Sequence, residues 1–273
     1  MTKRRQSSLP ALLRGVSGIA LFFLIWEIFA RSGMFSNALT PSLESILATL
    51  LSMLLQGDIL HHVASTLGRV LLGFGISFAI ALPIGMLMGR YRFCERLMSP
   101  LLSIFLPIPS LAWVPLFVLW FGIGNLATIL VVIYAAATQL TYNIWIGVRA
   151  VNPLWIKAAT IMGAGRAAVF WKIIWPGALP YIFTGVRLGF GRAWIAVIGG
   201  ELLASPQWGL GKVIFDAGEF LNTGTMLSAL IIIGLIGVFF ERVIFKNLER
   251  VTIVRWGMIT ASKHITPTKR SVL

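Results

Sequence analysis

Residues 97–148 read LMSPLLSIFLPIPSLAWVPLFVLWFGIGNLATILVVIYAAATQLTYNIWIGV and contain no Asp, Glu, Lys or Arg. A helix needs about 20 apolar residues to cross the roughly 30 Å hydrocarbon core of a bilayer, so this stretch is long enough for two crossings. Gly122-Ile123-Gly124-Asn125 lies between the two halves and has the glycine content of a turn. The stretch therefore predicts two transmembrane helices, at about residues 100–121 and 126–148.

The remaining apolar runs predict four more spans. Residues 70–89 and 220–240 also lack charged side chains. The first and fifth spans are less apolar, and in the first span Glu27 is four residues from Arg31, with which it is expected to pair. The six expected spans cover about residues 13–30, 69–89, 100–121, 126–148, 181–203 and 224–243.

Composition and charge also indicate a membrane protein. Hydrophobic residues make up 58% of the chain and charged residues only 12%, about half the usual charged share of soluble domains. The net charge of +14 does not indicate nucleic-acid binding, because the basic residues are spread between the apolar runs. With six spans, every Lys and Arg except Arg31, Arg69 and Lys212 lies on the same side of the membrane or in the part of a helix nearest that side. The positive-inside rule identifies this side as cytoplasmic. We therefore expect an all-α, multi-pass protein of the cell inner membrane with both termini in the cytoplasm.

Two segments expected outside the cell have patterns of their own. Thr40-Pro41 is typical of an N-cap followed by the first residue of a helix, and leucines at helical spacing continue from there to Gly57, so a short amphipathic helix is expected. Residues 205–223 are polar enough to meet a soluble partner. His61-His62 has no third ligand at metal spacing, so both are interpreted as surface residues and no metal site is expected.

The cytoplasmic loop 152–180 has the pattern of a short exposed helix. Asn152-Pro153 supplies a capping residue followed by proline at the first helical position. Gly163 can adopt the left-handed conformation that ends a helix. The helix between them is about 15 Å long, which is too short to cross a membrane.

The same loop has two further features. Ala158-Ala159 is expected to give the short helix one small-residue face, against which another protein can pack closely. A second helical piece is expected to begin at Arg166 and to end at Pro176. From spacing alone, an ordinary ordered loop remains open as an alternative.

This loop resembles the "EAA" loop of type I ATP-binding-cassette (ABC) importer permeases, whose pattern is Glu-Ala-Ala, three residues, Gly, nine residues, Ile-x-Leu-Pro. Segments 107–124 and 177–187 fit the same family, and the aliphatic sulfonate, taurine and nitrate permeases are the subgroup most resembled. Lys157 replaces the family Glu and Trp175 replaces Leu; the first change concerns one ionic contact and leaves the helix in place. The residues assigned to the loop by this resemblance are Asn152, Pro153, Lys157, Ala158, Ala159, Gly163, Ile173 and Pro176.

The resemblance implies a six-helix type I ABC importer permease fold and an assembly with other chains. Two ATP-binding subunits would dock on the loop, a second permease subunit, giving a homodimer, would complete the pathway, and a periplasmic substrate-binding protein would deliver the cargo. ATP and Mg²⁺ would bind to the ATPase, so no cofactor, catalytic residue or intrinsic ATPase activity is expected here. The expected parts are an N-terminal tail (1–12), a first span with the outer helix (13–64), the transporter core (65–245) and a basic tail (246–273).

Ionisable residues and prolines at membrane depth are candidates for the translocation pathway. Arg192 could face water and help an anion across, with a bundle salt bridge or snorkelling as the alternative. Arg187 is nearer the interface, and for Glu201 simple interfacial placement is favoured. The prolines of the third span, including Pro115, are expected to break its helix beside the pathway. The candidate pathway residues are Pro107, Pro109, Trp113, Arg187, Arg192 and Glu201.

Small residues at four-residue spacing predict close helix packing. Ala81, Gly85 and Gly89 form one such face, and Gly185 and Gly189 form another.

Two other functions stay open on the residues alone, a secondary transporter and a membrane-embedded enzyme. The first commonly shows internal repeats, and the second needs clustered acids, histidines or a nucleophile–base pair at membrane depth. Neither pattern is visible. The sequence does not fix which small anion or other solute is moved.

Overall fold

The computed structural model describes residues 9–34, 36, 38–204 and 206–249, and all regular elements in these ranges are helical. In chain order they are α1 (Leu9–Arg31), α2 (Leu43–Gln56), α3 (Asp58–Arg90), α4 (Arg92–Phe105), η1 (Ser110–Trp113), α5 (Val114–Phe121), α6 (Asn125–Ala150), α7 (Pro153–Ile161), α8 (Arg166–Val169), η2 (Phe170–Ile174), α9 (Trp175–Ala204), α10 (Leu210–Glu219), α11 (Thr223–Phe239), η3 (Phe240–Phe245) and α12 (Lys246–Glu249). The η1 turn is a 3₁₀-helix, whereas η2 and η3 are π-helical turns.

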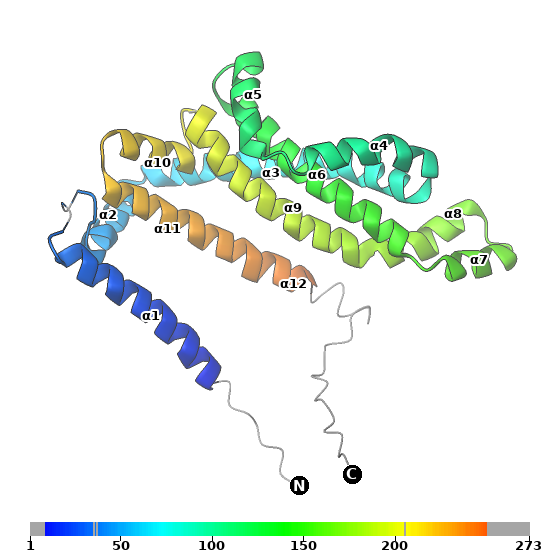
Figure 1. Ribbon diagram of the computed structural model, residues 1–273, viewed down its shortest axis with the longest axis horizontal. Helices are drawn as coiled ribbons and strands as arrows, with labels where there is room; N and C mark the ends of the chain where they lie inside the picture. Colours follow the sequence, from blue (N-terminus) through cyan, green and yellow to red (C-terminus); the bar gives the residue numbers. More distant parts are fainter. Residues whose placement is uncertain (1–8, 35, 37, 205, 250–273) are drawn as a thin grey trace, which may run out of the picture.

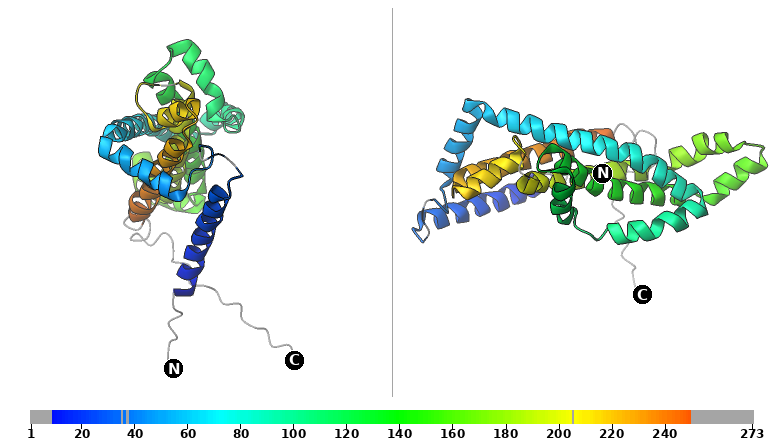
Figure 2. Two further views of the ribbon diagram at one scale, coloured as in Figure 1. Left: turned by 90° about the vertical axis from the view of Figure 1, so that its left-hand side faces the viewer. Right: turned by 90° about the horizontal axis from the view of Figure 1, so that it is seen from above.

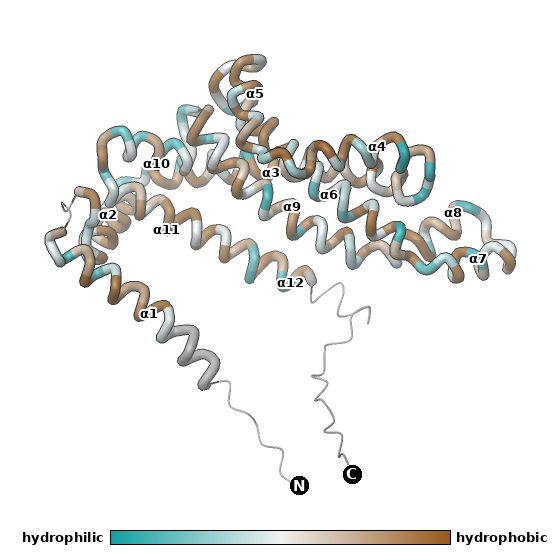
Figure 3. The backbone as a smooth tube through the Cα atoms, in the orientation of Figure 1, coloured by the Kyte–Doolittle hydropathy of each residue, from teal (hydrophilic) through white to brown (hydrophobic). Residues whose placement is uncertain are grey.

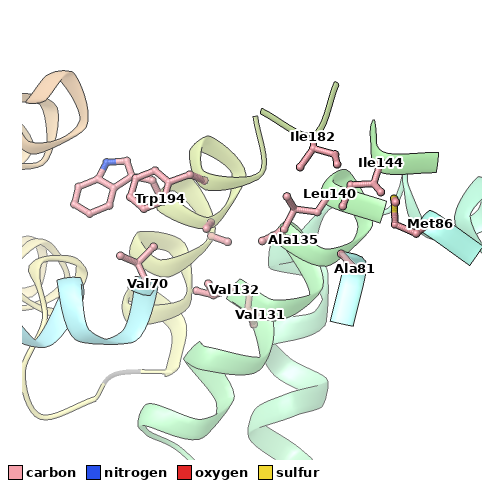
Figure 4. Packing of buried hydrophobic residues seen from close by; sticks show 14 of the residues in the cluster. Val70, Ala81, Met86, Val131, Val132, Ala135, Leu140, Ile144, Ile182 and Trp194 are labelled. Atoms are coloured by element: carbon pink, nitrogen blue, oxygen red, sulfur yellow. The ribbon is translucent and has the colours of Figure 1, made fainter. Parts of the chain in front are cut away.

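Helix α6 is the centre of the bundle, with α3 and α9 packed along it (Figure 1). Residues from all three helices form the buried core, including Val70, Leu140 and Ala193, each fully buried. Figure 4 shows Val70 and Leu140 with other side chains of this core. The end that carries α7 and α8 is called the inner end, and the opposite end, with α2 and α10, the outer end.

Glycines on α3 and α9 allow this close packing. A Cβ at Gly85 would lie 2.7 Å from Ile144 of α6, and one at Gly89 would lie 2.3 Å from Val148. On α9, a Cβ at Gly189 would lie 2.9 Å from Leu140. Real Cβ atoms do not approach so closely, so only glycine fits, and the two predicted small-residue faces are confirmed as packing faces.

Four described segments are long and apolar enough to cross a membrane: Asp58–Arg90, Asn125–Ala150, Arg166–Ala204 and Thr223–Leu248. The pieces Arg92–Phe105 and Ser110–Phe121 meet at 90° and make a fifth candidate if taken as one broken span. Figure 2 shows α5 projecting from the bundle and α1 standing apart from it. The sixth span and the cytoplasmic placement of the termini stay predictions.

Parts of the predicted tails lie outside the described residues. These are segments 1–8 and 250–273, which contain most of the basic residues that were assigned to the two cytoplasmic tails.

The first span is described as α1, in which Arg31 Nε donates to Glu27 Oε1 at 2.5 Å, as predicted.

The outer helix begins later than predicted. Ser42, not Thr40, is its N-cap, because the Ser42 hydroxyl accepts a hydrogen bond from the Ser45 N–H at 3.3 Å. Pro41 stays outside the helix, and its carbonyl accepts from the indole of Trp26 on α1 at 3.2 Å. The helix ends at Gly57 (φ +83°), as the sequence predicts.

Two predicted helix boundaries in the core are wrong. Helix α3 starts directly after Gly57, well before the predicted residue 69. Pro176 does not end the second helical piece of the loop, because Arg166–Ala204 is one continuous helical segment. The π-helical turn η2 before it closes with a hydrogen bond from the Trp175 N–H to the Phe170 carbonyl, a wider register than that of an α-helix, and the chain continues through the proline.

The predicted break in the third span is confirmed at Pro107 and Pro109, between α4 and η1. Tyr134 of α6 donates its hydroxyl hydrogen to the Phe105 carbonyl at 2.6 Å, which satisfies an oxygen at the broken helix end. Pro115 does not break a helix, in contrast to the prediction. It lies in the first turn of α5, where proline starts a helix instead of breaking one.

Apolar side chains cover much of the outside of the helices. Figure 3 shows that hydrophobic residues make up much of α1 and α11. Phe22, Leu119 and Leu235 are among the many large side chains that are more than half exposed. Such a surface is suited to lipid, as expected of a protein that crosses a membrane several times.

We predict that Gly89→Ala destabilises the bundle, because the added Cβ collides with Val148; overpacking costs about 1–3 kcal/mol. Gly75→Ala, on the open side of the same helix, is the matched control and should be neutral or slightly stabilising. The measurement is the melting temperature of the purified protein in detergent. Equal melting temperatures for the two variants would contradict the packing argument.

Candidate functional site

The inner-end loop forms the short helix that the sequence predicts. The Asn152 side chain caps α7 by accepting from the Leu154 N–H at 2.9 Å, and Pro153 occupies the first turn. Gly163 follows the helix with a φ of +84°, a conformation that favours glycine. Helix α7 lies at the far inner end of the molecule in Figure 1.

The two alanines of the motif do not share one face. Ala158 is exposed, whereas Ala159 is 8% exposed and belongs to the buried core. Neighbouring residues on an α-helix point about 100° apart, so only one of them can face outward here. The predicted Ala158-Ala159 face is therefore wrong, and Ala159 packs within the chain.

The outward side of α7 and its end is apolar instead. Leu154, Trp155, Ile161 and Met162 are 60–85% exposed, and with Ala158 they follow a helical stripe. Lys157 lies outside this stripe and is also exposed. An exposed apolar stripe of this kind is suited to contact with another protein or with the membrane.

The remaining motif residues line a cleft between α7 and the start of α9. Its volume is about 810 Å³, and Asn152, Trp155, Ile173 and Pro176 are on its wall. The structure thus brings Asn152, Ile173 and Pro176 together, while Lys157 and Ala158 face away from them.

A second hollow, called the charged groove, lies between α6, α9 and the end of the last long helix. Its volume is about 680 Å³, and its polar or charged lining residues are Gln139, Thr184, Arg187, Arg192 and Glu241. Arg187 pairs with Glu241 of η3, and both side chains are about half exposed. Arg192 is exposed and makes no hydrogen bond or ion pair with a described residue.

A small pocket of about 20 Å³ lies between this groove and the broken span. Gln139 and Arg192 line both hollows, and Ile108 and Ser110 of the break line the pocket. Pro107 and Pro109 alternate with these residues and are themselves exposed. The predicted pathway residues Arg187 and Arg192 therefore share one groove, with the break beside it.

Trp113 lies outside both hollows. Its ring is within 5.2–6.2 Å of the rings of Phe105, Phe117 and Tyr134. Its indole nitrogen is buried and has no hydrogen-bond partner among the described residues. Trp113 packs at the elbow between α4 and α5.

Glu201 lies inside the protein near the outer end of α9 and lines neither hollow, and its placement at the membrane interface stays a prediction. Its side chain is completely buried, and Arg69 of α3, 8% exposed, donates to it at 2.5 Å. The Thr66 hydroxyl and the Gly211 N–H also donate to this carboxylate, at 2.9 Å each. The sequence patterns did not predict that Arg69 and Thr66 contact Glu201. The available sign of an ion pair was the presence of one arginine and one glutamate near the outer ends of two apolar helices.

The segment Gly209-Leu210-Gly211 closes over this carboxylate. A Cβ at Gly209 would lie 2.5 Å from Glu201 Cδ, so the carboxylate occupies the space a side chain would need. His62 Nδ1 lies 2.9 Å from the Gly209 carbonyl oxygen and 3.0 Å from its nitrogen. His62 is thus half-buried in this cluster and is not a plain surface residue. The described residues contain no group of three His, Cys, Asp or Glu side chains that could hold a metal ion.

The profile of the family described as "Binding-protein-dependent transport system inner membrane component" matches residues 81–252. The chain is 32% identical over 231 residues to the taurine transport system permease protein TauC of Escherichia coli strain K12, covering 83% of this chain and 84% of that protein. It is 30% identical over 244 residues to the putative aliphatic sulfonates transport permease protein SsuC of Bacillus subtilis strain 168, covering 89% and 87%.

A solved structure shares the fold. It is a chain of the MetNI methionine ABC transporter, with a TM-score of 0.62 at 20% identity, covering 72% of this chain and 97% of that chain. The fold is therefore that of a type I ABC importer permease, as the sequence predicts.

We predict that Arg69→Met lowers stability by about 3–5 kcal/mol, because it leaves the buried Glu201 carboxylate without its charge partner. Arg149→Met, which breaks the exposed Arg149–Glu95 pair, is the control and should cost about 0–1 kcal/mol. The measurement is thermal unfolding in detergent. The double variant Arg69→Met/Glu201→Met should recover most of the lost stability. Equal destabilisation by Arg69→Met and by the control Arg149→Met would contradict the importance of the buried pair.

Proposed function

The chain belongs to the binding-protein-dependent transport system inner membrane component family and is the permease subunit of an ABC importer, and we propose that its cargo is a small sulfonate-type anion. Two relatives named for taurine and aliphatic sulfonates support this cargo class. The family name also describes dependence on a binding protein, and permease subunits of this family do not hydrolyse ATP themselves.

One observation carries the cargo proposal: Arg192 is exposed in the charged groove without a counter-ion among the described residues. A cation at membrane depth is costly unless it is paired or faces water, so such residues mark ion and substrate routes. The guanidinium group is planar, and its N–H donors match the oxygens of an oxyanion such as a sulfonate. Gln139 and Thr184 add neutral hydrogen-bonding groups to the same wall.

The assembly follows from the family and from the loop. The permease associates with ATPase subunits and a substrate-binding protein. In our proposal there are two ATPase subunits, which carry the ATP and Mg²⁺, and a second copy of this chain completes the pathway. The ATPase docks on the apolar stripe of α7, whose Leu154, Trp155 and Ala158 are exposed at the inner end.

The division of the chain is part of the proposal. Segment 65–245 forms the transporter core, preceded by a tail (1–12) and by the first span with its outer helix (13–64). The basic segment 246–273 follows as a cytoplasmic tail. The core contains α7, the groove residues Arg187, Arg192 and Glu241, and the Arg69–Glu201 pair.

We predict that Arg192→Gln lowers sulfonate uptake at least about tenfold, since a hydrogen bond to a charged group contributes about 1.5–3 kcal/mol. The measurement is ATP-driven uptake of radiolabelled ethanesulfonate into proteoliposomes that contain the complete transporter with its binding protein. Arg92→Gln, an exposed arginine at the inner end, is the control and should transport normally. Unchanged uptake by Arg192→Gln would make this arginine structural.

We predict that Ala158→Trp weakens ATPase docking, because a large ring prevents close approach to the stripe. Thr160→Trp is the control, because residue 160 is exposed about 160° away around the same helix. The measurement is the amount of ATPase subunit that co-purifies with the tagged permease, with membrane insertion checked in parallel. Equal loss in both variants, or loss in neither, would contradict docking through this stripe.

A further inference from the structure

Among the described residues, the ion pairs Arg69–Glu201 and Arg187–Glu241 join α9 to other helices and differ in accessibility. In the Arg69–Glu201 pair the side chains are 8% and 0% exposed, and three further groups hold the two partners in place. In the Arg187–Glu241 pair the side chains are 48% and 47% exposed, and both line the charged groove. The first pair is closed to solutes, whereas the second can be reached by any ion that enters the groove.

Glu241 is held at the groove by an unusual backbone turn. It lies in the π-helical turn η3, and such turns are frequent at functional sites because they redirect side chains. Phe240 and Phe245 of this turn pack on Phe190 of α9, with ring centroids 4.6 and 5.2 Å apart. The turn is therefore anchored on α9, and its carboxylate meets Arg187.

We infer that Glu241 is the resident counter-ion of the charged groove, which a transported anion displaces from Arg187 after contacting Arg192. This inference rests on the proposed anionic cargo. Arg192 stands five residues beyond Arg187 on α9, about 7.5 Å along the helix, and both line the same hollow. An oxyanion held by one guanidinium is thus within a short step of the other.

The exchange has a physical advantage for transport. Two arginines without an acid in the groove would hold an anion tightly and slow its release, whereas conduction needs binding that is weak enough to leave. Glu241 competes for Arg187 and returns to it once the anion has gone. It also gives Arg187 a negatively charged partner when no cargo is present, which lowers the cost of a charge inside the membrane.

The test uses the complete transporter in lipid nanodiscs with a cysteine reporter at the groove. The background is Cys94→Ser, and Thr184→Cys places a thiol on the exposed wall that Thr184 shares with Arg187. The probes are two methanethiosulfonates, the anionic sulfonatoethyl reagent, itself an ethanesulfonate, and the cationic trimethylammonioethyl reagent. The measured quantity is the ratio of their modification rates, anion over cation.

Glu241→Gln should raise this ratio about fivefold, the factor that corresponds to an exposed pair worth up to about 1 kcal/mol. The rise should vanish in an Arg187→Gln background, because the carboxylate acts by occupying that arginine. Glu95→Gln, which frees an exposed arginine outside the groove, is the matched control and should leave the ratio unchanged. An equal rise with and without Arg187 would show only a general charge effect and overturn the inference, as would no rise at all.

Uptake of radiolabelled ethanesulfonate separates this inference from the proposed cargo. If the wild-type transporter imports ethanesulfonate but Glu241→Gln leaves the ratio of modification rates unchanged, the exchange is refuted and the cargo proposal stands. If the ratio shifts only when Arg187 is present but no sulfonate is imported, the exchange at the groove is supported and the cargo class is refuted. In the expected case both readouts respond, and Glu241→Gln slows net uptake because release becomes slower.

Discussion

The close approach of α3 and α9 to α6 is the constraint on which the rest of the structure depends. In a bilayer, lipid tails are as apolar as leucine, so helices associate mainly through van der Waals packing at short distance. Gly85 and Gly89 let α3 reach Ile144 and Val148, and Gly189 lets α9 reach Leu140. Interdigitated cores deform little, so the three helices are expected to move as one layer.

The loop at the inner end is attached to this layer at both sides. Helix α7 follows directly after α6, and the helical segment that starts at Arg166 continues without interruption into α9. A Cβ at Gly147 would lie 2.4 Å from Tyr181, so α6 and α9 are in close contact just where the loop leaves them. If the ATPase docks on α7 as we propose, a push on this helix would be delivered to both α6 and α9, and α9 would carry it to Arg187 and Arg192 in the charged groove.

The two ion pairs of α9 divide the helix into a fixed and an exchangeable part. Removing one partner of a buried pair costs about 3–5 kcal/mol, whereas an exposed pair contributes about 0–1 kcal/mol. Arg69–Glu201 therefore ties the outer end of α9 to α3 and to the segment around Gly211. Arg187–Glu241, nearer the inner end, can open at little cost. An importer needs this combination, because a cargo ion has to pass without loosening the bundle that guides it.

The sequence predicts what is encoded locally and misses what depends on distant partners. The Asn152 cap, Gly163, the glycine faces and four of the six apolar spans are local patterns, and the structure confirms them. Glu201 and Arg69 are 132 residues apart, so no spacing rule connects them. Pro176 fails for a different reason: the π-helical turn that precedes it, in which the Trp175 N–H bonds to the Phe170 carbonyl, has no spacing signature in the sequence. The second helical piece of the loop is consequently continuous with α9, which suits a part that transmits force.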